Sequence, residues 1–414
     1  MSIPTSPVTL RMKMGEFIFL MAALMAIVAL SIDAALPALG YMAKDFEVAG
    51  DEIQFVITTL FLGFAVGQIF FGPISDRFGR LPSIYVGLAL FVLGCFLVIG
   101  AQSLEMVLFG RFIQGIGASG PRIMVLALAR DCFSGRPMAR VMSFTATVFM
   151  IVPILAPMVG QMLLWLGPWQ LIFKMYIAAA MVLGLWVLLR LDETLTLENR
   201  RSIHPSALWR ALTTVMSNRL ASGYTIVSGI TFGGFLGYLS SSQWLFQEIY
   251  NVGDAFPLYF GVLVLPNIVS SFINAKMVIR WGMFRLVQVA NFFVFGGSLS
   301  LLLYAYYYYD GIPPLMDMMV FLLVIFSGIG FQFGNLNALA MEPLGKMAGM
   351  GASFVGAVST LVSIPIGGFI GMSLNTNIYP LALGMTVCSL CSFLIMHWLR
   401  FGLSTPRVGV GSKL

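Results

Sequence analysis

Residues 72–80 read Gly72-Pro73-Ile74-Ser75-Asp76-Arg77-Phe78-Gly79-Arg80 and separate two apolar runs, 53–71 and 82–101. Each run is long enough to cross a bilayer, which takes about 20 apolar residues in a helix. Because the charged side chains of residues 72–80 cannot lie in lipid, this stretch is predicted to be a short loop at the membrane face. Its arginines place the loop in the cytoplasm by the positive-inside rule, and its glycines permit a tight reversal between antiparallel helices.

The composition excludes a soluble globular protein. Of the 414 residues, 59% are hydrophobic and only 10% are charged, so no water-soluble surface can be built from them. The net charge of +6 comes from basic residues in short loops, not from a patch interleaved with aromatic residues, so nucleic acid is not an expected partner. The chain has no GxxxxGK[ST] motif, no HExxH motif and no paired Cys/His cluster, so we expect neither an enzyme nor a metal site.

Twelve apolar runs predict an all-α polytopic membrane protein with twelve transmembrane helices and both termini in the cytoplasm. The runs are 17–39, 53–72, 82–101, 105–129, 140–165, 170–190, 220–245, 257–278, 286–307, 315–341, 348–374 and 379–399. With this topology nearly all loop lysines and arginines are cytoplasmic, Lys44 alone lies outside, and the acids show the opposite bias. A topology shifted by one helix would invert both biases.

The longest polar segment, 191–219, divides the chain near its middle. It is predicted to be a cytoplasmic linker between an N-terminal six-helix bundle, 1–190, and a C-terminal six-helix bundle, 220–414. An internal repeat supports two pseudo-symmetric halves, because Arg77-Phe78-Gly79 recurs as Arg280-Trp281-Gly282 between the second and third helices of the second half.

Residues 72–80 resemble the signature of glycine, aspartate, arginine, glycine and arginine that the major facilitator superfamily carries between helices two and three. Leu81 stands where a further basic residue is usual. Two later stretches resemble the signatures of helices four and five, and the second is a degenerate form of the Gly-Pro antiporter signature. These stretches are Arg111-Phe112-Ile113-Gln114-Gly115-Ile116-Gly117 and Ala156-Pro157-Met158-Val159-Gly160-Gln161. Further matches are Ser31-Ile32-Asp33, Leu36-Pro37, Arg130-Asp131 and 348–356, and with them the chain resembles the bicyclomycin-resistance type of twelve-helix drug/proton antiporter.

The resemblance implies a monomeric multi-pass carrier of the inner membrane that works by alternating access, with a small-molecule substrate, protons and the lipid bilayer as its partners. It implies no cofactor, because the proton gradient supplies the energy. It also implies an antiporter motif at Ala156, Pro157 and Gly160, and a cytoplasmic latch formed by Gly72, Asp76, Arg77, Gly79, Arg80 and Asp131. In this latch Asp76 meets the start of the eleventh helix, and the loop bases pair with acids such as Asp131. The alternative for the latch residues is that they serve topology and turn formation alone.

Charges within the spans point to the mechanism, because each costs roughly 2.5 to 3.5 kcal/mol at the bilayer centre. Asp33 is the only acid placed within a span, about 24 Å from the inner edge of the first helix. Arg111 lies about 9 Å below the outer edge of the fourth helix, at a matching depth. The superfamily fold places these helices together, so the two residues are predicted to form a proton-coupling pair. The alternative is a fixed ion pair that braces the two helices.

Other polar residues within the spans are predicted to line a substrate cavity: Gln114, Ser119 and Arg122 in the fourth helix, and Gln332 and Asn335 in the tenth. Arg122 follows Arg111 by eleven residues and therefore shares its helix face, about 16 Å deeper. Substrate contact and an interhelical hydrogen bond remain open for Arg122. The spans contain one acid, Asp33, and three bases, Arg111, Arg122 and Lys174. Neutral, zwitterionic or anionic amphiphiles are therefore expected as cargo rather than dications.

Three functions are weighed. The first is proton-coupled export of small amphipathic compounds, and the second is transport of a defined metabolite such as an organic anion, an amino acid derivative or a siderophore. The third is a membrane sensor or scaffold that moves nothing, against which the charges within the spans argue, since a scaffold has no need to bury them.

Overall fold

The computed structural model describes residues 12–50, 52–196, 198, 200, 212–373 and 376–401, and throughout these ranges the regular structure is helical. The two termini, 1–11 and 402–414, and the middle of the predicted linker, 201–211, lie outside the described residues. Twelve helices of the described part are long and apolar enough to cross a membrane, so the predicted twelve-span architecture is confirmed.

The first six spans form one bundle. Their elements are α1 (Met14–Asp33) with the 3-10 turn η1 (Leu36–Ala38) and α2 (Leu39–Asp45), then α3 (Phe55–Phe78), α4 (Arg80–Ile99), α5 (Leu104–Cys132), α6 (Gly135–Leu166) and α7 (Gln170–Arg190). Helix α5 is central, because α3 and α4 pack along it, while α1 packs on α6 and α4 on α7.

The last six spans form the second bundle. Their elements are α9 (Arg219–Gln243) with the π-helical turn η3 (Trp244–Ile249), η4 (Gly253–Ala255) with α10 (Phe256–Trp281), α11 (Met283–Tyr308), α12 (Leu315–Met341) with η5 (Glu342–Met347), α13 (Ala348–Met372) and α14 (Tyr379–Phe401). Helix α13 packs along α9, and α11 packs on both α12 and α14.

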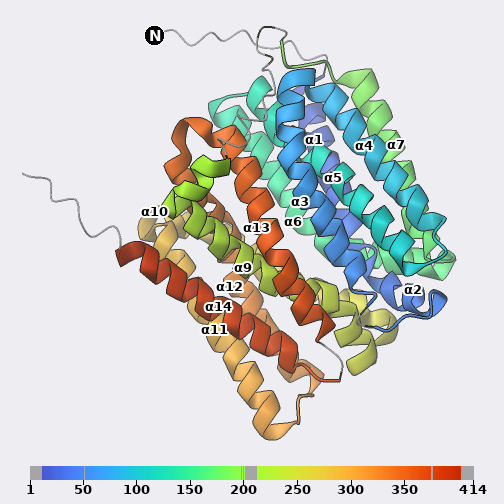
Figure 1. Cartoon of the computed structure of the whole chain (residues 1–414), viewed down its shortest axis with the longest axis vertical. Coiled ribbons are helices and arrows are strands. Elements are labelled where there is room, and N and C mark those ends of the chain that lie inside the picture. The colour runs from blue at the N-terminus through green and yellow to red at the C-terminus, as the bar shows by residue number, and fades with distance from the viewer. Residues whose placement is uncertain are drawn as a thin grey trace, which may run out of the picture.

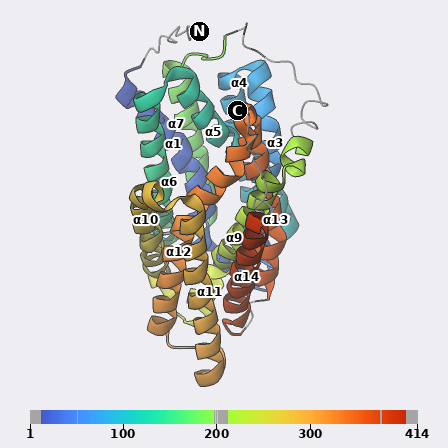
Figure 2. The ribbon, with the colours of Figure 1, turned by 90° about the vertical axis from the view of Figure 1, so that its left-hand side faces the viewer.

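The two bundles meet through two helix pairs, α3 with α13 and α6 with α10. Figure 1 shows the first bundle and the second bundle side by side, and Figure 2 looks onto α6 and α10. We call the end of the molecule that carries the turn between α3 and α4 the motif end, and the opposite end, where α2 lies, the α2 end.

Two glycines form the same turn in the two bundles. Gly79 ends α3 and begins α4 with φ 113°, and Gly282 ends α10 and begins α11 with φ 74°. The predicted loop over 72–80 was therefore wrong in extent, because α3 continues to Phe78 and only Gly79 separates it from α4. A side chain is strained at such positive φ values, so glycine is needed at both positions. The internal repeat seen in the sequence therefore corresponds to one backbone turn at equivalent places in the two halves.

Candidate functional site at the break in the first span

The first span is interrupted at Asp33. Helix α1 ends at this residue, and the 3-10 turn η1 that follows contains Pro37. Proline has no backbone N–H, so Pro37 cannot donate the helical hydrogen bond that would reach the Asp33 carbonyl. The expectation of one continuous helix over 17–39 was therefore wrong. The break leaves Asp33 at a helix end rather than in mid-helix.

The Asp33 side chain is only 4% exposed, and it has no hydrogen-bond or ion-pair partner among the described residues. Two buried phenols lie near it, those of Tyr176 of α7 and Tyr238 of α9. The Tyr176 hydroxyl donates to the Leu30 carbonyl at 2.9 Å, but the Tyr238 hydroxyl is buried with no partner in the described structure. Asp33 thus lies where the first bundle faces α9 of the second, beside an unsatisfied phenol.

Tyr238 was not predicted as a site residue. It packs between Phe260 of α10, at a ring-centroid distance of 6.0 Å, and Phe326 of α12, at 4.8 Å. In the sequence it is one aromatic residue within a long apolar run, where most aromatic residues serve packing. Its unsatisfied hydroxyl becomes visible only once the helices are in place, because a buried tyrosine hydroxyl usually finds a partner.

Gly160 of the degenerate antiporter motif packs against the break. A Cβ at this position would collide with the Ala34 carbonyl and lie 3.1 Å from Pro37 Cγ. The same motif places Ala156 and Pro157 within α6, and both are buried. The absence of a side chain at Gly160 therefore allows α6 to approach the interrupted span directly after Asp33.

Arg111 is fully buried, and it does not pair with Asp33. Its Nη1 donates to the Ser31 carbonyl at 3.0 Å and to Gln114 Oε1 at 2.7 Å, while Nε donates to the Val56 carbonyl at 3.2 Å. Its guanidinium also lies 5.8 Å from the centre of the Phe173 ring of α7. The predicted ion pair is therefore wrong in this structure. The side chain instead joins α5 to α1 and α3 through backbone carbonyls and lies against the Phe173 ring of α7, at the level of the break.

Gln114 and Ser119 lie inside the first bundle, so their predicted place in a substrate cavity was wrong. Gln114 is held between Arg111 and Cys95, whose sulfur accepts from Nε2 at 3.2 Å. Ser119 donates to the Ile116 carbonyl at 2.7 Å and packs against Gly67 of α3. Both side chains are fully buried because α3 and α4 cover this face of α5.

Arg122 is exposed, unlike Arg111 on the same helix. Its guanidinium lies 5.0 Å from the centre of the Phe64 ring of α3 and 5.8 Å from that of Phe149 of α6. Helices α3 and α6 are the two that meet the second bundle. Arg122 therefore lies on the side of the first bundle that faces the second, which keeps its predicted contact with cargo open.

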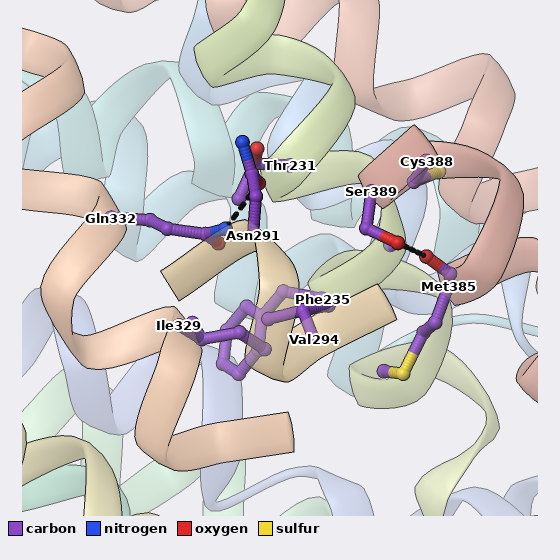
Figure 3. A pocket seen from close by; sticks show the side chains of 10 residues that line it. Thr231, Phe235, Asn291, Val294, Ile329, Gln332, Met385, Cys388 and Ser389 are labelled. Atoms are coloured by element: carbon purple, nitrogen blue, oxygen red, sulfur yellow. Dashed lines mark hydrogen bonds between the residues drawn. The ribbon is translucent and has the colours of Figure 1, made fainter. Parts of the chain in front are cut away.

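Gln332 and Asn335 serve the interior of the second bundle, so the structure also contradicts their predicted place in the substrate cavity. Gln332 Nε2 donates to Asn291 Oδ1 at 2.6 Å, beside a cavity of about 20 Å³ that also touches Thr231 and Ser389 (Figure 3). This volume holds about one water molecule. Gln332 Oε1 has no protein partner in the described structure and can accept from such a water. Asn335 donates to Asn274 Oδ1 at 2.7 Å and so ties α12 to α10.

The motif end carries an ion-pair network around Arg80. The side chain is 4% exposed, and it donates to Asp131 Oδ2 at 2.8 Å, Asp76 Oδ1 at 2.6 Å and Ser75 Oγ at 2.8 Å.

The other motif residues lie outside this network. Arg77 is exposed, and its guanidinium lies 5.1 Å from the centre of the Phe78 ring. Gly72 leaves room for α13, since a Cβ there would lie 3.0 Å from Ser353 Oγ. Asp76 was expected to meet the start of α13, but the side chains of 345–350 lie outside what is described.

Glu193 joins this network from the segment after α7, which was not predicted. Its carboxylate accepts from the backbone N–H of Arg80 at 2.9 Å and of Leu81 at 3.1 Å, so it caps the first turn of α4. A carboxylate is favoured there because the N–H groups at a helix start have no helical partner. The next residue, Thr194, donates to Asp131 at 3.1 Å. The only sign of this role in the sequence was the polar character of the segment 191–219, which was interpreted as a linker between the bundles and nothing more.

The α2 end is closed by contacts between the bundles. Asp254 of η4 accepts from Gln161 Nε2 at 3.0 Å and from Trp165 Nε1 at 3.1 Å, and both donors belong to α6. A Cβ on Gly50 would collide with the Trp244 ring, so the loop after α2 lies against η3. These contacts join the two bundles at the α2 end.

Comparison with known proteins assigns a family. Residues 21–372 match the Major Facilitator Superfamily. A Bicyclomycin resistance protein homolog of Haemophilus influenzae is 27% identical over 391 residues, covering 92% of this chain and 96% of the relative. The Multidrug resistance protein MdtL of Salmonella paratyphi C is 27% identical over 92% of this chain and 95% of its own. An uncharacterized MFS-type transporter, YdgK of Bacillus subtilis, is 28% identical over 95% of this chain and 96% of its own.

Solved structures share the fold. A D-xylose-proton symporter superposes with a TM-score of 0.71 at 14% identity, over 91% of this chain and 97% of its own. The human organic anion transporter MFSD10 superposes with a TM-score of 0.65 at 16% identity, over 94% of this chain and 100% of its own. The expected fold class and the resemblance stated from the sequence are both confirmed.

Proposed function

Because this chain belongs to the Major Facilitator Superfamily, we propose that it exports small amphipathic compounds from the cell, driven by the entry of protons. The observation that carries the proposal is Asp33, a buried and unpaired carboxyl group at a helix break between the two bundles. Relatives over nearly the whole chain are named for resistance to bicyclomycin and to multiple drugs, which supports export of drug-like molecules.

The orientation follows from the charges. The motif end, with Arg77 and Arg80, faces the cytoplasm, and the α2 end faces outward. The protein resides in the inner membrane as a monomer with both termini inside, its energy source is the proton gradient, and it catalyses no covalent reaction. The state described here is closed outward by Asp254 and the loop after α2.

Asp33 couples protons to this movement. An unpaired charge in such a buried place costs several kcal/mol, so the protonated carboxylic acid is the species that fits the outward-closed state. Opening the α2 end moves α9 relative to the break and lets water reach the carboxyl group. Asp33 then exchanges its proton with one side at a time, as the bundles alternate. Arg111 does not neutralise Asp33 directly but holds α1 in position through the Ser31 carbonyl.

The test uses proteoliposomes with an imposed pH gradient, and bicyclomycin together with a panel of amphipathic dyes as probes. We expect Asp33→Asn to abolish gradient-driven transport while the protein remains folded, because the amide cannot carry a proton. Glu248→Gln, which removes an exposed acid at the α2 end, is the matched control and should transport normally. Substantial gradient-driven transport by Asp33→Asn would refute the coupling role, and a wild-type protein that moves none of the probes would refute drug export.

Transport of an organic anion is the second candidate, and Arg122 favours it. This exposed guanidinium faces the second bundle between two aromatic rings, an arrangement that suits an anionic, partly apolar molecule. In the same liposomes, organic anions should then outcompete neutral drugs, and Arg122→Gln should remove that preference. Preference for dications would exclude this candidate.

A further inference from the structure

The second bundle carries a groove that the transport mechanism does not use. Its volume is about 540 Å³, and it lies between α11 and α14 at the motif end. Both helices pack on other helices of the second bundle, and they run side by side in Figure 1. The lining residues are Trp281, Phe284, Arg285, Gln288, Val289, Phe393, His397 and Arg400.

The groove is basic. Arg285 and Arg400 are both exposed and line it from opposite helices, and no acid lines it. Among the described residues of the second bundle, Glu342 is the only acid at the motif end, and it lies outside the groove. The Arg400 guanidinium lies 5.7 Å from the centre of the Phe284 ring, which holds this charge at the groove.

The start of α11 adds a second attraction for an anion. Helix α11 begins at Met283, and its N-cap, Gly282, offers no side-chain hydrogen bond to the first turn. The N–H groups at such a helix start attract anions, and they disfavour a cation such as Arg285 in the same turn. A bound phosphate would satisfy the N–H groups and neutralise the guanidinium at once.

The rest of the groove suits a lipid rather than a free ion. Trp281 is 48% exposed, and Val289 and Phe393 are each 42% exposed, so apolar surface continues from the arginines along the spans. Tryptophan and arginine are typical of the boundary between water and hydrocarbon, and basic pockets between helices at this depth bind anionic headgroups. Gln288 also lines the groove.

We propose that this groove binds an anionic phospholipid of the phosphatidylglycerol type. The phosphate lies between Arg285 and Arg400 at the start of α11, and the acyl chains follow Val289 and Phe393 into the bilayer. The site is distinct from the drug path, so it does not depend on the proposed function.

The test measures phosphatidylglycerol bound to the purified full chain in detergent by native mass spectrometry. The double variant Arg285→Gln/Arg400→Gln should bind at least about tenfold more weakly, because both charge-assisted contacts to the phosphate are lost. The matched control is Lys276→Gln/Arg280→Gln, which removes two positive charges from α10 at the motif end, outside the groove. This variant should bind phosphatidylglycerol normally. Equal weakening in both variants would reduce the effect to general surface charge and overturn the proposal.

A second variant keeps both arginines and fills the groove instead. Val289→Trp should expel the lipid while leaving the charges unchanged. Phosphatidylcholine and inorganic phosphate serve as comparison ligands, and neither should match phosphatidylglycerol in affinity or in thermal stabilisation of the wild-type protein. Unchanged binding in Val289→Trp, or equal stabilisation by inorganic phosphate, would overturn the assignment to a lipid.

Discussion

At the scale of single residues, Asp33 and Arg111 lie at the same depth in the membrane but do not form an ion pair with each other. Nε and Nη1 of Arg111 donate to the Ser31 and Val56 carbonyls and to Gln114, while Nη2 is buried without a partner in the described structure, and the Asp33 carboxyl also lies without a partner at the end of α1. We therefore assign different roles to the two side chains. Arg111 holds the helices together, and Asp33 is left available for proton exchange.

Replacing Arg111 with Met should destabilise the protein more than it impairs coupling. The change leaves two buried carbonyls and the Gln114 oxygen without donors, so we expect a loss of about 2 to 4 kcal/mol in the free energy of unfolding. Thermal unfolding of the purified protein measures this, and flux per folded molecule in liposomes measures coupling.

Asp33→Asn is the contrasting variant, because it should unfold at or above the wild-type temperature while transporting nothing against a gradient. If Arg111→Met instead kept full stability and lost only coupling, the two residues would act as a pair after all.

At the scale of elements, the break between α1 and η1 and the glycine of α6 that packs on it form one unit. Pro37 interrupts the helix, and Gly160 allows α6 to contact the interruption. The degenerate antiporter motif thus retains the one glycine that this contact needs, although Ala156 and Gln161 replace its other two.

Gly160→Leu should therefore push α6 away from the break. We expect a loss of about 1 to 3 kcal/mol from overpacking, together with loss of transport, measured by thermal unfolding and by flux. The control is Gly296→Ala in α11, where nothing lies within 4 Å of the added carbon, and which should be neutral or slightly stabilising. Normal transport by Gly160→Leu would show that the close approach is dispensable.

At the scale of the whole molecule, the bundles are held by different contacts at their two ends. Asp254 joins η4 to α6 at the α2 end, whereas Arg80, Asp131 and Glu193 form a network within the first bundle at the motif end. The first set must break when the α2 end opens, so it sets the population of the closed state.

Asp254→Asn should shift that population toward molecules that are open at the α2 end. Weakening two charge-assisted hydrogen bonds at a partly exposed place should change the equilibrium by about 1 kcal/mol, or roughly fivefold. Spin labels at Leu166 and Leu258, both exposed, report the distance between α6 and α10. The control is Asp317→Asn, which removes a carboxylate of α12 that accepts a hydrogen bond from Tyr304 of α11. An unchanged distance distribution would exclude this contact as a determinant of the closed state.

Much of the fold could be predicted because it depends on local properties. The length and hydrophobicity of each run predict a span, and the glycines of the two Arg-x-Gly turns predict the reversals at Gly79 and Gly282. The site was predicted only in part. Asp33 was identified because a charge within a span is costly, and Arg80 because residues 72–80 resemble a family signature, but Gln114, Gln332 and Asn335 were assigned to the wrong surface.

The sequence by itself determined the depth of each polar side chain, since residue count along a helix converts directly into distance across the membrane. Only the tertiary structure decided the direction each one faces, because the rotation of a helix about its axis is set by packing against its neighbours. That rotation turned Arg111 toward the Ser31 carbonyl and placed Tyr238 near Asp33, and the path of the chain after α7 brought Glu193 from the linker to the start of α4.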